Sequence, residues 1–388
     1  MKETDLRVLL LTWDYPPAKG GIQVWMFELA RRLPEAEVTV LAAALPGGEA
    51  FDAAAEVRVR RLGAARIGRL AFLFQLVVVT IARCLMSRPD LIVCGHVLTS
   101  PAGLLARWML GVPFVVFTYA YEIRRKGTRR LVSLLLRRPA LVLAISRFTE
   151  DAVLSHGVPP SRVRILNPGT DSERFAPQSN GSEPALRTGP KTLLSVSRLN
   201  ELYKGHDTVI RALPLIKAKY PDIRYLIAGD GRLCEYLHRL ARSVGVETDV
   251  VFLGEVPDES LPGLYRSCHV LVQVSREAKS GGGAEGFGIV CLEAGACGKP
   301  VVAGRSGGLS EAVIDGTTGI LVDPRDVGVV AESILALLQD SALAQRMGQA
   351  GRARVLREFT WDHMARNARR LFAEGAGQVW EAPRASSS

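Results

Sequence analysis

The segment Ser280–Gly304 reads SGGGAEGFGIVCLEAGACGKPVVAG and predicts a loop, a helix, a turn and a strand in succession. A glycine-rich loop ends at Gly286, and an apolar helical run follows to about Cys297. The turn Gly298–Pro300 then stops the helix before an apolar strand. A helix start carries unpaired backbone N–H groups and the positive end of the helix dipole, so it attracts phosphate and sugar oxygens. We therefore expect a ligand-binding helix start in this segment.

Backbone groups and two carboxylates in this segment are suited to one polyhydroxylated ligand. The N–H groups of Phe287, Gly288 and Ile289 can donate to it, and the glycines let it approach the backbone. Glu285 precedes the helix, and Glu293 lies one turn beyond Ile289 on the same face. Ionised carboxylates accept hydrogen bonds from vicinal hydroxyls. The alternative is a buried helix with solvated glutamates, which explains less well why two acids, two glycines and a helix start coincide.

Strand-like runs alternate with helical stretches along the chain, which predicts two doubly wound parallel sheets. The first series lies at 8–11, 38–42, 91–94, 114–118, 141–145 and 162–166. The second lies at 193–196, 225–228, 250–253, 270–274, 301–303 and 320–322. The polar stretch 178–190 between them contains Ser, Gly and Pro and is the candidate linker.

Composition is that of a globular protein with two ordinary domains, since 48% of the 388 residues are hydrophobic. The six cysteines occur singly, without a Cys-x-x-Cys pair, so neither a zinc site nor a disulfide framework is predicted, and reduced thiols are expected. The N-terminus enters a strand at once, without an apolar leader and cleavage site. We therefore expect the protein to be cytoplasmic.

Much of the net charge of +10 lies early in the chain. Arginines between 58 and 69 precede an apolar run at 70–82, and basic residues at 124–130 precede a second run at 131–136. Neither run has the roughly 18 uninterrupted apolar residues of a spanning helix. Basic helices with an apolar face suit an anionic membrane surface, although solvated arginines over core helices are the alternative. Nucleic-acid binding is not predicted, because no recognised module is present.

The order Glu285-Gly-x-Gly-x-x-x-x-Glu293, followed by Ala-x-Ala-x-Gly-x-Pro-Val, resembles the donor-sugar motif of retaining GT-B glycosyltransferases. In that family the first glutamate contacts the transferred sugar and the second contacts the nucleotide ribose. The segment PPAKGGIQ at 16–23 resembles the family's N-terminal glycine loop, which implies that the amides of Gly20 and Gly21 approach the donor diphosphate. The resemblance covers nearly the whole chain and is strongest for bacterial phosphatidylinositol mannoside mannosyltransferases.

Two cations follow the first strand of the second series. Arg198 offers a guanidinium fork and Lys204 an ammonium group, which together can neutralise a departing diphosphate. Taken alone they would be solvated surface charges. The resemblance implies the diphosphate-binding role for both, metal-independent transfer, and a nucleotide base held near Gly254. It also implies that the departing phosphate deprotonates the acceptor, and no Asp-x-Asp metal motif is found in the chain.

One position departs from the family pattern. Relatives carry Thr-His-Gly-His-Glu where this chain has Thr-Tyr-Ala-Tyr-Glu at 118–122, so Tyr119 replaces the histidine that contacts the donor sugar. A tyrosine hydroxyl also donates hydrogen bonds but reaches farther, which leaves the identity of the donor open. His96, after the strand at 91–94, is interpreted as a structural histidine, with a position facing the cleft as the alternative.

These features predict a GT-B fold of two Rossmann-like domains facing across a cleft. The expected boundaries are 1–177, a linker at 178–190, 191–359, a C-terminal helix at 360–375 returning to the first domain, and a tail at 376–388. The predicted activity is retaining transfer of a sugar, mannose being favoured, from GDP-mannose or a UDP-sugar to a lipid-linked or glycan acceptor at the inner membrane face. The alternatives are transfer to a small soluble acceptor and a non-catalytic binding protein of the same fold.

Overall fold

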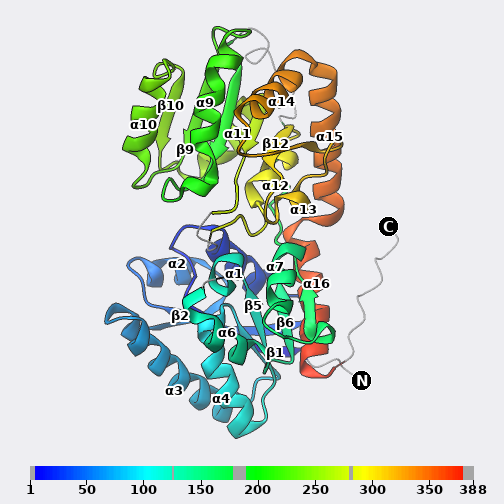
Figure 1. Cartoon of the computed structure of the whole chain (residues 1–388). Helices are drawn as coiled ribbons and strands as arrows, with labels where there is room; N and C mark the ends of the chain where they lie inside the picture. The colour runs from blue at the N-terminus through cyan, green and yellow to red at the C-terminus, as the bar shows by residue number, and fades with distance from the viewer. Residues whose placement is uncertain (1–4, 125, 178–188, 279–282, 379–388) are drawn as a thin grey trace. The chain divides into compact units, whose positions relative to one another are not determined.

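The chain forms two compact α/β units in the computed structural model (Figure 1). The structure describes residues 5–124, 126–177, 189–278 and 283–378. The first unit comprises Met1–Gly169 and Trp361–Ser388, and the second comprises Thr170–Thr360. The linker predicted at 178–190 and the tail predicted at 376–388 lie largely outside the described residues, as do Ser280–Gly282 of the glycine-rich loop.

The first unit is a seven-stranded, fully parallel sheet in the order β3-β2-β1-β4-β5-β6-β7. Its strands are β1 (Leu6–Thr12), β2 (Ala36–Ala43), β3 (Arg58–Leu62), β4 (Leu91–Cys94), β5 (Phe114–Thr118), β6 (Leu141–Ala144) and β7 (Val163–Ile165). Its α-helices are α1 (Gly21–Arg32), α2 (Gly48–Ala54), α3 (Arg69–Ser87), α4 (Ser100–Leu110), α5 (Ala120–Ile123), α6 (Arg129–Leu136), α7 (Arg147–Leu154) and α16 (Trp361–Ala376).

Helices cover both faces of this sheet because alternate residues of each buried strand point to opposite sides. On one side Leu9 and Leu11 pack in a core with residues of α3, α4 and α6. On the other side Val8 and Leu10 lie with Phe372 of α16 and residues of α1. The final helix of the chain therefore completes the core of the first unit.

The second unit has a six-stranded parallel sheet in the order β10-β9-β8-β11-β12-β13. The strands are β8 (Thr192–Val196), β9 (Arg224–Ala228), β10 (Val250–Gly254), β11 (Val270–Gln273), β12 (Val301–Gly304) and β13 (Gly319–Val322). The helices are α9 (His206–Lys217), α10 (Cys234–Ser243), α11 (Leu261–Ser267), α12 (Ile289–Ala296), α13 (Leu309–Ala312), α14 (Val327–Gln339) and α15 (Ser341–Glu358), with short 3-10 turns η5 (Leu202–Lys204) and η6 (Asp258–Ser260).

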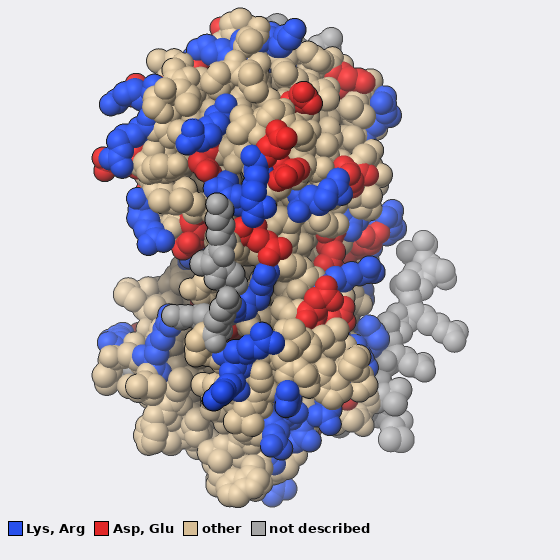
Figure 2. Space-filling model, in the orientation of Figure 1, with Lys and Arg blue, Asp and Glu red and all other residues tan. Residues whose placement is uncertain are grey.

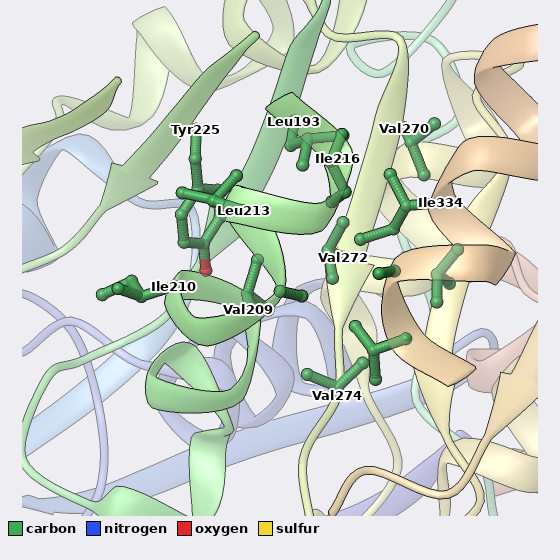
Figure 3. Packing of buried hydrophobic residues seen from close by; sticks show 14 of the residues in the cluster. Leu193, Val209, Ile210, Leu213, Ile216, Tyr225, Val270, Val272, Val274 and Ile334 are labelled. Carbon is green, nitrogen blue, oxygen red and sulfur yellow. The ribbon is translucent and has the colours of Figure 1, made fainter. Parts of the chain in front are cut away.

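One apolar cluster fixes the sheet of the second unit against its helices (Figure 3). Val270 and Val272 of β11 meet Ile216 of α9 and Ile334 of α14 in this cluster, and all four side chains are buried. Polar residues at the carboxyl ends of β8 and β11 are thereby held on a close-packed support.

The predicted fold class is confirmed, and each predicted strand is present, with ends shifted by two residues or fewer. The prediction missed β3, whose arginines were interpreted only as a basic segment. Arg61 lies on this edge strand with its side chain 9% exposed, and it forms an ion pair with Asp52 at 2.7 Å. The exposed arginines Arg58 and Arg60 suit an edge strand, because their charge opposes pairing with another chain.

Helix α3 has 19 residues and extends beyond the apolar run predicted at 70–82. Among the described residues it is the single helix whose length and composition match a membrane-spanning segment; α14 and α15 match only as a pair, bent by 97°. Its buried side chains Phe72, Leu76, Thr80 and Cys84 recur every four residues and form one stripe against the sheet. Leu73, Val77, Val79 and Ile81 pack partly against the same core. The apolar residues of α3 that are exposed are Leu70, Phe74, Val78, Leu85 and Met86.

Candidate functional site

The loop before α12 is held by the glycines that follow β12. The N–H of Gly308 donates to the carbonyl of Glu285 at 2.9 Å. A Cβ atom on Gly308 would lie 2.1 Å from the carbonyl oxygen of Gly286, so the two loops approach more closely than any side chain allows. The sequence analysis did not include Gly307 and Gly308 in the site, although a glycine pair directly after a strand is a signal for such an approach.

The carboxylate of Glu285 receives three donors from this unit. Lys204 Nζ lies 2.6 Å from Glu285 Oε2, and each of these side chains is 17% exposed. Gln273 Nε2 and Ser275 Oγ, at the end of β11, each lie 3.4 Å from the same oxygen. Burial acts to lower the pKa of Lys204, but the charge of Glu285, the neighbouring Tyr203 and the hydrogen bond to Glu285 together raise it. The structure thus joins two predicted residues in one ion pair and adds two polar residues that the sequence analysis missed.

The backbone around Lys204 is fixed by a glycine. Gly205 has a φ of +84°, and a Cβ atom there would lie 2.1 Å from the carbonyl oxygen of Val274. Arg198 is exposed on the loop after β8, close enough for its charge to oppose protonation of Lys204. Arg198 and Lys204 therefore lie near each other as predicted, but Lys204 contacts a carboxylate in this structure.

A buried neutral histidine supports the loop that carries these cations. His206 Nε2 lies 2.8 Å from Ser197 Oγ, and Nδ1 lies 3.0 Å from the hydroxyl of Tyr225. Burial, together with the nearby charge of Lys204, lowers the pKa of His206 to about 4. The imidazole therefore stays neutral at physiological pH and adds no further positive charge beside Lys204.

Glu293 lies on α12, as predicted, and is held by a tyrosine. The hydroxyl of Tyr265, on α11, donates to Glu293 Oε2 at 2.5 Å. Burial raises the pKa of Glu293, and this hydrogen bond opposes the rise. No sequence signal singles out Tyr265, because α11 carries no motif.

The start of α12 differs from the prediction. The helix begins at Ile289, whereas the sequence analysis began it directly after Gly286. Gly288 has a φ of +102°, which cannot belong to a right-handed helix, and a Cβ atom there would lie 2.6 Å from Leu309 Cδ2. Phe287 is buried with 2% exposure, so its side chain belongs to the core. The first turn of α12 still presents unpaired N–H groups, now beginning at Ile289.

Gly254 is the last residue of β10, the edge strand that pairs with β9. It has a φ of +64°, and its carbonyl accepts a hydrogen bond of 2.8 Å from the N–H of Gly229. The space beside its Cα is open, since a Cβ atom would meet nothing within 4 Å. Its predicted place near the nucleotide base stays a prediction.

In the first unit, the predicted glycines lie at the start of α1. Gly20 has a φ of +151° and precedes Gly21, the first residue of the helix. Gln23, one turn later, donates to Asp14 Oδ1 at 2.8 Å and ties the helix start to the loop after β1. This arrangement places backbone N–H groups of Gly21 and its successors at a carboxyl edge of the sheet.

Tyr119 is a core residue in this structure. It is 6% exposed, and its hydroxyl donates to the carbonyl of Gly95 at 3.1 Å. His96 lies beside its ring and contacts Glu122, with 2.5 Å between Nε2 and Oε2. Burial lowers the pKa of His96, but Glu122 outweighs burial and raises it. The pair joins the loops after β4 and β5, so the structural interpretation of His96 accounts for these contacts.

Among the described residues, no group of three or more His, Cys, Asp or Glu side chains is arranged to hold a metal ion. The donor-binding residues predicted from the sequence are two cations, two carboxylates, Tyr119 and backbone N–H groups.

Comparison with known proteins places this geometry in a family. Residues 179–354 match the family described as "Glycosyl transferases group 1", and residues 19–174 match "Glycosyltransferase Family 4". A GDP-mannose-dependent alpha-(1-6)-phosphatidylinositol monomannoside mannosyltransferase of Mycolicibacterium smegmatis is 34% identical in an alignment of 368 positions that covers 91% of this chain and 95% of the relative. A D-inositol 3-phosphate glycosyltransferase of Corynebacterium diphtheriae is 28% identical and covers 92% of this chain and 90% of its own length.

Solved structures show the same fold. Anabaena HepE in complex with UDP has a TM-score of 0.80 at 21% identity, covering 95% of this chain and 99% of that chain. Sucrose-phosphate synthase from Thermosynechococcus elongatus has a TM-score of 0.80 at 23% identity, covering 95% and 98%. The two parallel α/β units thus have the GT-B fold. The chain belongs to the glycosyltransferases of group 1 and family 4.

Proposed function

We propose that this glycosyltransferase transfers mannose from GDP-mannose, with retention of the anomeric configuration, to a lipid-linked or glycan acceptor at the cytoplasmic membrane face. The observation that carries the proposal is the Glu285 carboxylate, held by Lys204, Gln273 and Ser275 beside the start of α12. The relative that is 34% identical over nearly its whole length is a GDP-mannose-dependent mannosyltransferase, which supports mannose as the sugar.

The proposed roles follow from the charge of each group. Glu285 accepts hydrogen bonds from hydroxyls of the transferred sugar, and Glu293 accepts those of the ribose. Arg198, Lys204 and the first N–H groups of α12 balance the negative charge that grows on the departing diphosphate. Lys204 exchanges part of its contact with Glu285 for a diphosphate oxygen. The departing phosphate then takes the proton of the acceptor hydroxyl.

Transfer is expected to proceed with anomeric retention and without an added divalent metal. The supporting observation is the pair of cations beside the helix start, which supplies the positive charge that a metal would otherwise provide. Incubation of the full chain with GDP-mannose and, separately, UDP-sugars, followed by NMR of the product, measures both the donor and the configuration. An inverted product, or activity abolished by EDTA and restored by magnesium, would overturn this part of the proposal.

Membrane attachment is supported by the outward face of α3. Leu70 is 84% exposed and Phe74 is 73% exposed, and Trp108 at the end of α4 is 81% exposed. The described part of α3 contains no acidic residue, and the exposed Arg66 and Arg88 flank it. In Figure 2 the surface in the region of α3 and α4 is largely uncharged on the viewed face, and the charged side chains near it are mostly Lys and Arg. An apolar stripe with basic flanks suits an anionic bilayer.

The membrane proposal predicts that the protein sediments with phosphatidylglycerol vesicles and that salt weakens this binding steeply. Phe74→Glu is expected to reduce binding by at least about tenfold, because a charge replaces an inserted aromatic ring. Leu215→Glu is the matched control, since Leu215 is also exposed, at 51%, but lies on α9 in the second unit.

The predicted basic segment at 124–130 is less free to bind lipid than the sequence indicates. The guanidinium of Arg124 packs on the ring of Phe148, 4.7 Å from its centroid, and Arg129 donates to the carbonyl of Ser155. Arg125 lies outside the described residues. Equal sedimentation with neutral and anionic vesicles would show that the arginines are only solvated.

A further inference from the structure

Tyr265 is a buried residue whose one polar atom is directed at a site carboxylate. Its ring is 0% exposed, and Phe175 packs edge-on against it with 5.6 Å between ring centroids. Its hydroxyl donates to Glu293 Oε2 at 2.5 Å. Because packing fixes the ring, the position of the hydroxyl is fixed as well, and with it the position of the carboxylate that it holds.

This hydrogen bond acts on a carboxylate that burial disfavours. Burial raises the pKa of Glu293, and the Tyr265 hydroxyl is the group that opposes this most strongly. Two charged groups on neighbouring segments have smaller effects, Arg174 lowering the pKa and Asp258 raising it. Burial, together with the nearby charge of Glu293, raises the pKa of the thiols of Cys291, on α12, and Cys297, directly after it, so they stay protonated and add no charge.

A carboxylate has about four acceptor positions, and Tyr265 occupies one of them. The bond orients the carboxylate of Glu293 and leaves its other lone pairs available to ligand hydroxyls. Since Tyr265 is buried, it cannot contact such a ligand itself. Any effect that it has on ligand binding must pass through Glu293.

We propose that Tyr265 is a positioning residue for ribose recognition: by holding the carboxylate of Glu293 in one orientation, it sets the preference of the enzyme for ribonucleotides over nucleotides that lack ribose hydroxyls. This inference rests on the proposed role of Glu293. The ligand class is a nucleoside diphosphate, recognised through the vicinal hydroxyls of its ribose.

Calorimetry on the full chain with GDP and with 2′,3′-dideoxy-GDP tests the inference. The wild-type protein is expected to bind GDP at least about tenfold more tightly, the effect of hydrogen bonds to a charged group. Tyr265→Phe should weaken GDP binding severalfold and leave the affinity for 2′,3′-dideoxy-GDP unchanged. Loss of the hydroxyl should also move the acid limb of GDP binding to higher pH, because the carboxylate then protonates more easily. Tyr220→Phe is the matched control, since its hydroxyl also bonds a protein oxygen, the carbonyl of Leu338 at 3.1 Å.

Glu293→Gln separates this inference from the proposed function. Suppose that Glu293→Gln loses the preference for GDP over 2′,3′-dideoxy-GDP, whereas Tyr265→Phe keeps both this preference and the wild-type pH dependence of GDP binding. The inference is then wrong, and the proposed role of Glu293 stands. If Glu293→Gln keeps the full preference, Glu293 does not bind the ribose, and the proposed role and the inference fail together. Equal losses in Tyr265→Phe for both nucleotides would show a merely structural effect and would also overturn the inference.

Discussion

Glu285→Gln is expected to lower kcat by at least about 100-fold, on the order of 2.7 kcal/mol, while the nucleoside diphosphate still binds. Glu285 is proposed to contact the sugar ring, whose charge and pucker change during transfer, so its loss affects the transition state most. Lys204, now 2.6 Å from Glu285 Oε2, would lose its carboxylate partner and be free for the diphosphate. Diphosphate affinity should therefore be kept or increased. Steady-state kinetics and calorimetry with GDP measure the two effects separately.

Variants of Arg198, Lys204 and Glu293 are expected to differ from Glu285→Gln in their effects on kcat, KM and diphosphate affinity. Lys204→Ala and Arg198→Ala should lower both kcat and diphosphate affinity, because the charge that they face grows as the diphosphate departs. Glu293→Gln should mainly raise the KM for the donor, because the ribose does not change during the reaction. If Glu285→Gln loses diphosphate affinity but keeps kcat at saturation, and Glu293→Gln does the reverse, the two carboxylates have been assigned the wrong way round.

The ion pair also predicts that Lys204 and Glu285 are not independent. In a double-mutant cycle, the combined loss in Lys204→Ala/Glu285→Gln should be smaller than the sum of the single losses in log kcat. Groups in direct contact usually show such coupling, whereas distant ones add. If the losses in log kcat are additive, the contact between Lys204 Nζ and Glu285 Oε2 is broken before the reaction and has no part in it.

Gly205→Ala is expected to destabilise the second unit by about 2 to 5 kcal/mol and to abolish most activity. Two costs add: a non-glycine residue at a left-handed φ costs roughly 1 to 2 kcal/mol, and overpacking costs typically about 1 to 3 kcal/mol. The overpacking is severe, because the new Cβ would lie 2.1 Å from the carbonyl oxygen of Val274, which is backbone and cannot rotate away. Thermal or urea unfolding measures the stability, and kcat reports the displacement of the adjacent Lys204.

Gly245→Ala separates the two costs. Gly245 has a φ of +75°, similar to that of Gly205, but a Cβ atom there would meet nothing within 4 Å. Its substitution should cost only the conformational term and leave kcat unchanged. If the two alanine variants unfold at the same denaturant concentration with the same kcat, the close approach of Gly205 to β11 has no energetic importance.

The sequence predicted the fold well because its signals are local. Short apolar runs between helical stretches specify a buried parallel strand wherever they occur, and the strands were found within two residues of their predicted ends. The missed strand β3 carries three arginines among its five residues, a pattern that charge alone assigns to a solvated segment. Hydrophobic periodicity therefore identified the edge strands β7, β10 and β13 as well as the central strands, and it missed only β3, whose run is interrupted by charged residues.

The site was only partly predictable because its contacts are between distant segments. Glu285 and Lys204 were each singled out, yet their ion pair joins residues 81 positions apart, and no spacing rule contains it. Gln273 and Tyr265 belong to no sequence motif. Only the folded structure shows that Gln273 contacts Glu285 and that Tyr265 contacts Glu293. Tyr119 was expected at the ligand because of its position in a motif. In the structure it is buried and its hydroxyl donates to the carbonyl of Gly95, so its place at a ligand stays a prediction.

Helix α16 has a consequence for the order in which the chain can fold during synthesis. The ribosome releases the N-terminal end first, and by the time Thr360 has been made every strand of the second unit exists. The first unit at that moment still lacks the helix whose residues Met364, Leu371 and Phe372 are buried in its core. One face of its sheet, whose strands have all been made, must therefore stay partly uncovered, or be covered by something else, until the last turn of α16 has left the exit tunnel. The unit that is begun first is the unit that is completed last.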